Sequence, residues 1–500
     1  MTSSDITTST PSTDAEAAER LDGVSDIRRF FYRNETPIYF VSPTNFNLLG
    51  ADEWVKGLKF ISYIDTFDGQ HPNVFVPSEA PHEVFGSIEE INNYLLEHKE
   101  VADYVKKRGP GGKVLFLMFD ERTEALAAQL GLEICFPRAD LRTRLDNKMV
   151  TTRIAARAGV ASVPNVIARV DSYEALCRVS SDLGTDLVVQ TAFGDSGHTT
   201  FFISDEASWR KHAGEIVGED EVKVMRRITP RGAAIEACVT RHGTIVAPLM
   251  TELVGFPELT PYKGGWCGNE IYADAFDRGA REAARDATFA VGEELKKEGY
   301  RGYFELDFLI DEGSNEIYLG EMNPRITGAS SITNHTVFAL SDAPLFLFHL
   351  LEWMDVDYDL DVQALNARWA KPQNVDGWSQ LVIKHTESTI GILREAPATG
   401  IWRMTGDGVQ FARFDTHRRM VESENEAFFL RITGPGDYVY EGADLGILVS
   451  RGRFMTDAFR LTDRARSWIH GIRSQFVADE PAIVPEVAET LAEVGGFKMV

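Results

Sequence analysis

The sequence predicts a multidomain protein that combines α/β and α+β architecture. Three observations lead to this fold class. Short apolar strands alternate with helical patterns near the N-terminus, antiparallel strand pairs flank a long helix in the middle, and short strands separated by Gly and Pro follow residue 375. A length of 500 residues is enough for about three domains.

The domain organisation follows these changes in pattern. Residues 1–25 are rich in Ser and Thr and acidic, so we expect a disordered tail. Residues 26–140 read as a Rossmann-like domain, with strands at 37–41, 58–62 and 113–119 and helices at 87–99 and 121–130. A central α+β domain is expected over 141–374, and a β-rich C-terminal domain over 375–500.

Composition excludes several classes of function. The chain is 44% hydrophobic with a formal net charge of −25, a surface that repels nucleic acid. It has no apolar run long enough to span a bilayer and no apolar signal-peptide core near the N-terminus. Its four cysteines are far apart, which argues against a zinc site or a disulfide framework. We therefore expect a cytoplasmic enzyme that interacts with neither membrane nor nucleic acid.

The central region begins with a helix for which Asp146 is the expected N-cap and Gly159 the residue just past the end. A long helix is expected at 277–298. The expected strands are 186–190, 199–203, 221–228, 233–240, 244–253, 302–310 and 316–321.

The C-terminal region changes character. Its expected strands are 379–384, 390–394, 400–404 and 427–433. A final helix carries Ala465, Trp468, Ile469, Ile472 and Phe476 at helical spacing, which indicates a packing face.

The strongest chemical signal is a polar set on the hairpin at 302–321. Asp307 and Glu321 fall on neighbouring strands of a short hairpin, so both carboxylates can share one face. Their flanks are strongly apolar, and unpaired charges in a buried hairpin are costly without a cation. With the carboxamide of Asn323 they offer only oxygen ligands, which Mg²⁺ prefers. Arg325 follows and is suited to a phosphoryl group or a substrate carboxylate. Glu305 is expected either to face solvent or to contact the metal ligands without binding the metal itself.

Two weaker signals point to phosphate. Residues 194–200 form a turn with Gly194, Ser196 and Gly197 after an apolar strand that ends at Gln190, and such turns expose backbone N–H groups. Lys148 stands at the start of a helix, where its charge can join the helix N-terminus. Alone, such a turn is more often a plain hairpin loop, and a lone lysine at a helix start is more often an exposed surface residue.

The order of these elements resembles the ATP-grasp superfamily, in particular its carboxylate–amine ligases and its biotin-carboxylase-like branch. The matching stretches are LDNKMVTTRIAARAGVASVPN, DLVVQTAFGDSGHTTFFI, AAIEACVTRHGTIVAPL and GYFELDFLIDEGSNEIYLGEMNPRITGAS. The resemblance implies that residues 26–140 form the domain preceding the ATP-grasp fold, that 141–374 form the ATP-grasp domain with a lid at about 160–230, and that the C-terminal part is similar to the β-rich tail of biotin carboxylases.

The resemblance also assigns roles by position. Gln190 stands where many members have a lysine, so α-phosphate binding is expected to differ there. From their position directly after the metal-binding strand, residues 327–336 are expected to line the acceptor pocket. The segment from Lys223 to Ile228 matches the adenine-contacting hinge, although the glutamate often found there is absent. The implied set is Lys148, Gln190, Ser196, Gly197, Arg226, Ile228 and Glu236 for the nucleotide, Asp307, Glu321 and Asn323 for the metal, and Arg325 for catalysis.

The activity implied is ATP-dependent ligation with Mg²⁺, for which Mn²⁺ can substitute. A substrate carboxylate attacks the γ-phosphorus, and the resulting acylphosphate reacts with an amine to give an amide, ADP and phosphate. Small-molecule carboxylates and amines are the expected partners, and a homodimer is compatible with the sequence. Two alternatives stay open: carboxylation through carboxyphosphate with biotin or another acceptor, and a non-catalytic nucleotide-binding protein.

Overall fold

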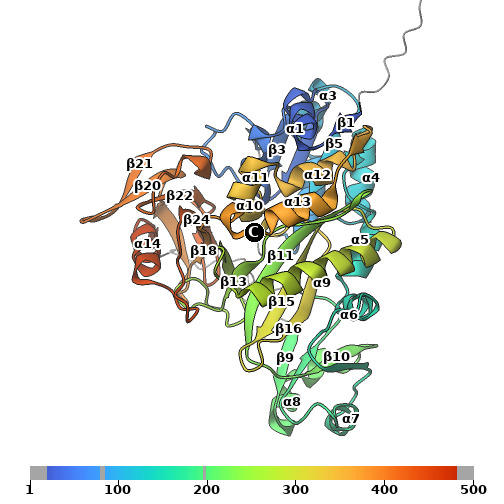
Figure 1. The fold of residues 1–500 in the computed structure, drawn as a ribbon. Helices are drawn as coiled ribbons and strands as arrows, with labels where there is room; N and C mark the ends of the chain where they lie inside the picture. The colour runs from blue at the N-terminus through green and yellow to red at the C-terminus, as the bar shows by residue number, and fades with distance from the viewer. Residues whose placement is uncertain (1–19, 79–84, 195–198, 481–500) are drawn as a thin grey trace, which may run out of the picture.

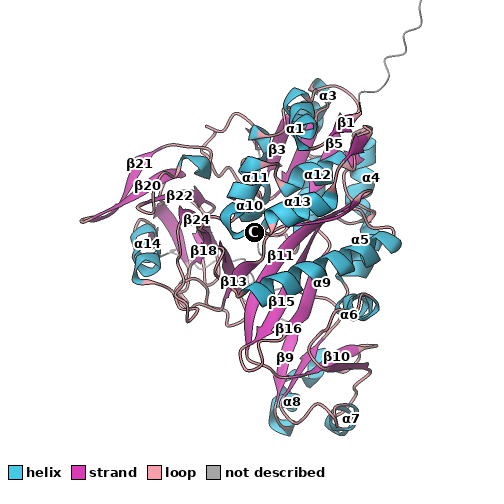
Figure 2. Cartoon of the chain, in the orientation of Figure 1, coloured by secondary structure: helices cyan, strands magenta, loops and turns pink. Residues whose placement is uncertain are grey.

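The computed structural model describes residues 20–78, 85–194 and 199–480. It is a mixed α/β protein built around one large antiparallel sheet, with a parallel sheet above it and a small lobe below it in Figure 1. Figure 2 shows strands in all three of these parts, with helices beside each of them. Most of the predicted tail and the two residues Ser196 and Gly197 lie outside the described residues.

The N-terminal unit is a five-stranded parallel sheet with the order β4-β3-β2-β5-β6. Its strands are β2 (Ile38–Ser42), β3 (Leu58–Ser62), β4 (Val74–Phe75), β5 (Lys113–Phe116) and β6 (Glu133–Ile134). Its helices are α1 (Val24–Arg33), α2 (Ile88–Glu97), α3 (Lys99–Lys107) and α4 (Glu121–Gln129). The predicted strands and helices of this unit are confirmed. Their apolar residues are buried on both faces of the sheet, as a parallel sheet requires.

Two short helices lead from this unit to the centre, α5 (Ala139–Asp146) and α6 (Lys148–Arg157). The prediction of Asp146 as the N-cap is wrong. Asp146 ends α5, and the side chain of Asn147 accepts from the N–H groups of Met149 and Val150. The short Asn147 side chain therefore fixes where α6 begins.

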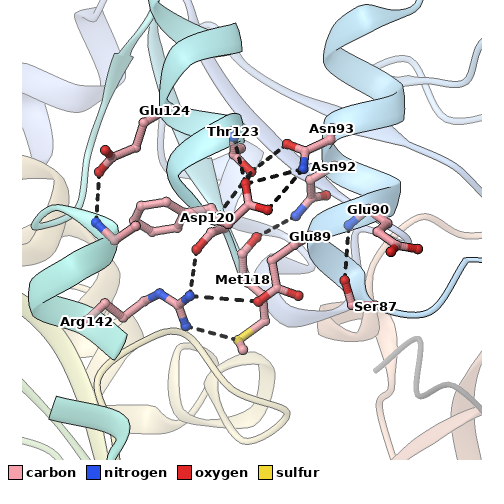
Figure 3. Close-up of polar contacts among 12 residues, drawn as sticks. Ser87, Glu89, Glu90, Asn92, Asn93, Met118, Asp120, Thr123, Glu124 and Arg142 are labelled. Carbon is pink, nitrogen blue, oxygen red and sulfur yellow. Dashed lines mark hydrogen bonds and ion pairs between the residues drawn. The ribbon is translucent and has the colours of Figure 1, made fainter. Parts of the chain in front are cut away.

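A buried arginine anchors α5 to the N-terminal unit. Arg142 donates to the carbonyl oxygen of Phe119 at 2.6 Å and lies 3.8 Å from the Glu89 carboxylate (Figure 3). Beside it, Asp120 caps α4 by accepting from Thr123 and also accepts from Asn93 (Figure 3). These contacts fix the direction in which the chain enters α6 and hence the position of Lys148.

The lower lobe in Figure 1 is a four-stranded antiparallel sheet with the order β7-β10-β8-β9. Its elements are β7 (Asn165–Ala168), α7 (Tyr173–Val179), β8 (Leu187–Gln190), β9 (Thr200–Ile203), α8 (Glu206–Ile216) and β10 (Val222–Arg226). It buries its own apolar cluster, which includes Leu176, Val189 and Trp209. We call residues 165–226 the lower lobe; they fall within the range 160–230 expected for a lid.

The large sheet has the order β16-β15-β11-β13-β14-β18-β24-β22-β20-β21, with β12 paired to β11. Its first half comprises β11 (Pro230–Thr240), β12 (Gly243–Val246), β13 (Met250–Val254), β14 (Trp266–Ile271), β15 (Gly302–Asp311) and β16 (Ile317–Asn323). The expected single strand 244–253 is wrong, because residues 247–249 separate β12 from β13. Helix α9 (Arg278–Lys297) packs on β11 and β12, close to its predicted bounds.

The sheet continues without interruption into the C-terminal part. Strand β14 pairs with β18, so the sheet crosses the boundary expected at residue 375, and that boundary stays a prediction. The remaining strands of the large sheet are β18 (Trp378–Lys384), β20 (Gly400–Thr405), β21 (Gly408–Arg413), β22 (Glu426–Arg431) and β24 (Asp444–Arg451). A small sheet holds β19 (Gly391–Glu395), β23 (Tyr438–Val439) and β25 (Val477–Asp479).

Helices close the remaining surfaces of the sheet. They are α10 (Ser330–Thr333), α11 (Val337–Ser341), α12 (Leu345–Leu351), α13 (Val362–Trp369) and α14 (Asp463–Arg473). The predicted apolar face of the last helix is confirmed for Ala465, Trp468, Ile469 and Ile472, whereas Phe476 follows the helix end. In the described part of the chain, helices are too short or too polar to cross a membrane.

Candidate active site

The predicted hairpin forms, and its register gathers the polar residues on one face. Asp307 of β15 lies opposite Glu321 of β16, and Glu305 lies opposite Asn323. Directly opposed residues on antiparallel strands project to the same side, with Cβ atoms about 5 Å apart. The four side chains therefore share one patch of the sheet, as the sequence predicted for Asp307 and Glu321.

Asn323 ties this patch together. Its Nδ2 donates to Asp307 Oδ2 at 3.0 Å and to Glu305 Oε2 at 3.2 Å. Its Oδ1 accepts from Nη2 of Arg325 at 2.9 Å. Glu305 is buried at 5% exposure, so the expectation that it faces solvent is wrong, and it instead helps to orient the amide.

The carboxylates carry an electrostatic penalty. Burial, together with the charges of neighbouring acids, raises the pKa of Asp307 and of Glu305 well above the usual range. A further acid that the sequence did not single out, Glu252 of β13, lies beside them. Burial and then the Glu321 carboxylate raise the pKa of Glu252 to about 7. The patch therefore favours a bound cation.

The donor set fits Mg²⁺ with a ligand present. Among the residues that the structure describes, no three His, Cys, Asp or Glu side chains have the geometry of a complete metal site. Asp307 and Glu321 provide two carboxylates, and Asn323 provides an amide oxygen. Mg²⁺ usually takes one or two carboxylates and completes its octahedron with water and phosphate oxygens.

Lys148 reaches the same patch from the start of α6. Its Nζ lies 3.1 Å from Glu321 Oε1 and donates to the carbonyl oxygen of Gly194 at 2.9 Å. Its own N–H donates to the carbonyl oxygen of Ala192, and the residue is only 5% exposed. Lys148 is therefore a buried cation of the site, and not the exposed surface lysine that the sequence left as an alternative.

The lower lobe contributes further residues. Gln190 donates from Nε2 to Thr200 Oγ1 at 3.1 Å, while its Oε1 is buried without a partner among the described residues. Arg226 ends β10 and is exposed. Ile228 joins an apolar cluster between the lower lobe and the hairpin, formed with Val163, Val188, Met225, Tyr318 and Leu309.

Glu236 has a different environment from the one expected near a nucleotide. It is fully buried on β11, opposite Glu305. Its carboxylate accepts from the hydroxyls of Tyr303 at 2.5 Å, Ser330 at 2.6 Å and Thr327 at 3.1 Å. These bonds hold the segment that follows Arg325 against the sheet, and a contact of Glu236 with nucleotide stays a prediction.

The same segment meets a buried arginine from the C-terminal part. Ser331 of α10 accepts from Arg418 Nη1 at 3.0 Å and donates to Gln380 Oε1 at 2.7 Å. Arg418 is 1% exposed, and its Nη2 has no partner among the described residues. Burial lowers the pKa of the Arg418 guanidinium to about 9. No sequence signal marked this residue, because its position beside α10 depends on the tertiary fold.

Comparisons with known proteins show what the chain is similar to in sequence and in fold. No family model matches the chain. A stretch of 261 residues is 24% identical to the pyruvate carboxylase of Aspergillus niger and covers 49% of this chain but 20% of that protein. A pyruvate carboxylase of Aspergillus terreus is 24% identical over 217 residues, which is 41% of this chain and 17% of that protein. The chain thus matches about a fifth of the length of these relatives.

Solved structures match over most of the chain. The biotin carboxylase domain of Hydrogenobacter thermophilus 2-oxoglutarate carboxylase, solved with MgADP, ADP and bicarbonate, has a TM-score of 0.58 at 12% identity and covers 88% of this chain and 90% of its own. Biotin carboxylase of Campylobacter jejuni has a TM-score of 0.57 at 12% identity, covering 88% and 92%. The chain has the ATP-grasp fold of biotin carboxylases.

The acids of the patch predict how stability depends on pH. Because the folded-state pKa of Glu252 is raised, the unfolded chain loses this proton first, and stability falls as pH rises from about 4.5 towards 7. Glu252→Gln should remove a loss on the order of 2 kcal/mol between pH 5 and pH 8, allowing for partial solvent screening. Urea unfolding without metal or nucleotide measures the difference.

The exposed Glu215 of α8 provides the control, since Glu215→Gln should follow the wild-type pH profile. An unchanged profile for Glu252→Gln would mean that Glu252 does not carry this electrostatic cost.

Proposed function

We propose that this protein is an ATP- and Mg²⁺-dependent ligase that activates a carboxylate as an acylphosphate and joins it to an amine. The observation that carries the proposal is the shared face of Asp307, Glu321 and Asn323, with Lys148 and Arg325 beside it. This arrangement offers oxygen ligands for a hard cation and ammonium and guanidinium groups for phosphate. The proposed reaction needs no side-chain nucleophile, because the substrate carboxylate attacks the phosphorus itself.

Each residue has a separate task in the proposed reaction. Asp307, Glu321 and Asn323 would hold Mg²⁺, which neutralises charge on the β- and γ-phosphates when it is bound. Lys148 exchanges its contact with Glu321 for a phosphate oxygen. Arg325 stabilises the charge that develops on the transferred phosphoryl group. The substrate carboxylate attacks the γ-phosphorus in line, and ADP leaves. Phosphate then leaves the acylphosphate when the amine attacks its carbonyl carbon.

The nucleotide base is assigned to the apolar cluster around Ile228. Its members come from the lower lobe, from the residues directly before and after the lobe, and from β15 and β16, so closing the lobe would cover a base against the hairpin. The loop with Ser196 and Gly197, outside the described residues, is proposed to cover the phosphates. Gln190 and Arg226 stay proposed nucleotide contacts at the ends of β8 and β10.

Arg418 is our candidate for binding a substrate carboxylate. Arg418 has no carboxylate partner within ion-pair distance among the described residues, and a buried guanidinium of this kind carries a large desolvation cost, which an anionic ligand would offset. Arg418 donates to Ser331 of α10. Ser331 follows Arg325 by six residues and belongs to the segment expected to line the acceptor pocket.

ATP-dependent carboxylation is the second candidate. The specific observation in its favour is the likeness to biotin carboxylase structures, one of which was solved with bicarbonate. The same residues would then act on carboxyphosphate. A non-catalytic nucleotide-binding role is the third reading, and the complete set of Asp307, Glu321, Asn323 and Arg325 argues against it. A homodimer, a cytoplasmic location and an absence of nucleic-acid and membrane partners stay predictions.

Phosphate release distinguishes the two enzymatic readings. We expect ATP hydrolysis only with an organic carboxylate, fastest with an amine also present, because the acylphosphate must form and then be consumed. Hydroxylamine should trap this intermediate as the hydroxamate of the activated acid, which mass spectrometry identifies. Panels of amino acids and other small carboxylic acids are the first substrates to test.

Glu321→Gln is the control, since it keeps the side-chain volume but removes one metal-ligand charge. It should fold normally and lose phosphate release and hydroxamate formation together. Bicarbonate-dependent ADP formation that requires free biotin, without a hydroxamate from any acid, would reverse the ranking in favour of carboxylation.

Arg418→Met tests the substrate carboxylate. Loss of a charge-assisted contact should raise KM for the anionic substrate roughly tenfold or more, while KM for ATP changes little. Arg418→Met should not destabilise the fold, because an apolar side chain replaces an unpaired buried charge. If KM for every substrate is unchanged, Arg418 does not bind the substrate.

A further inference from the structure

Lys223 is a buried lysine on β10 of the lower lobe. It is 1% exposed, and its ammonium makes no hydrogen bond or ion pair with any residue in the described part of the chain. Burying the charge of a lysine is costly, and burial lowers the pKa of Lys223 to about 8. Neither the fold of β10 nor its apolar neighbours explain why a lysine stands here.

The charges around Lys223 are those of the candidate site. The Glu321 carboxylate stabilises its ammonium, and the Lys148 ammonium opposes it. Lys148 already pairs with Glu321 at 3.1 Å. Two ammonium groups therefore face one carboxylate, and Glu321 is also a proposed metal ligand. Once a cation binds Glu321, both lysines lack a counter-ion.

The lobe places Lys223 beside Gln190. The two residues are directly opposite in the antiparallel pairing of β10 and β8, so their side chains leave the sheet on the same side, with Cβ atoms about 5 Å apart. The buried Oε1 of Gln190 has no partner in the described residues. The wall of the lobe that faces the hairpin thus holds one cation and one unused acceptor.

We infer that Lys223 is a second phosphate-binding cation of the site, which acts from β10 of the lower lobe together with Lys148. Its ligand is the polyphosphate of a nucleoside triphosphate. This inference rests on the proposed function. In this inference Lys223 of β10 supplies the positive charge of this wall of the lobe. The phosphates are therefore compensated although Gln190, on the facing position of β8, is neutral.

The register provides a charge-relocation test. Lys223→Met should weaken binding of a non-hydrolysable ATP analogue with Mg²⁺ roughly 10- to 100-fold, because a charged hydrogen bond is lost. Gln190→Lys in the Lys223→Met background places an ammonium on the facing position of β8 and should restore most of the affinity. Gln190→Lys alone should not tighten binding, because it sets two ammonium groups side by side. Isothermal titration calorimetry measures all three.

Three controls separate the outcomes. Lys211→Met removes an exposed lysine from α8 of the same lobe and should bind like the wild type. Adenosine, which has no phosphate, should bind Lys223→Met and wild type equally. Lys223→Arg keeps the charge and should stay within a few-fold of the wild type. Thermal unfolding should show Lys223→Met to be at least as stable as the wild type, since an apolar group replaces an unpaired buried charge.

The results distinguish this inference from the proposed function. Wild-type affinity in Lys223→Met, with weak binding in Lys148→Met, overturns the role of Lys223 and leaves the proposed function intact. Loss of affinity without rescue by Gln190→Lys, or with equal loss for adenosine, also overturns it, because the effect is then structural. No binding of the analogue to the wild-type protein overturns both.

Discussion

The structure depends on one constraint, the burial of several carboxylates on a single face of the large sheet. The pairing of β11, β15 and β16 places Glu236, Glu305, Asp307 and Glu321 on this face. Their charges are compensated in different ways. Three hydroxyls satisfy Glu236, the amide of Asn323 bridges Glu305 and Asp307, and Lys148 pairs with Glu321. A ligand can replace the contact between Lys148 and Glu321, because a metal ion can take over the carboxylate and a phosphate can take over the ammonium.

The rest of the fold holds cations against that face. Arg142 fixes α5 to the N-terminal unit, and Asn147 starts α6, so that Lys148 points to Glu321. The lower lobe brings Lys223 to the same carboxylate, whereas Arg418 of the C-terminal part donates to Ser331 of α10. Lys148 and Lys223 thus both face Glu321, an arrangement suited to a ligand that carries both a metal ion and several negative charges.

The sequence predicts the parts of this site that local patterns determine. The hairpin of Asp307 and Glu321 is encoded by apolar alternation and a short polar turn, and the N-terminal sheet by alternating strands and helices. Glu252 and Arg418 could not be found in this way, because their surroundings depend on strands and helices distant in the sequence. The resemblance places Lys223 in the segment expected near the adenine, whereas its position opposite Gln190 follows from the pairing of β8 and β10. The prediction of Asp146 as an N-cap is wrong because two helices meet there and Asp and Asn are both good caps. Asp146 ends α5, and the neighbouring Asn147 caps α6.

We propose that Asp307, Glu321 and Asn323 hold the metal of a bound nucleotide. Anomalous diffraction at the manganese absorption edge, from crystals grown with Mn²⁺ and a non-hydrolysable ATP analogue, locates that metal directly. We expect a peak within about 2.5 Å of oxygens from these three side chains and of the terminal phosphates, with Lys148 moved from Glu321 to a phosphate. A nucleotide bound elsewhere, or a metal peak that these oxygens do not contact, would contradict it.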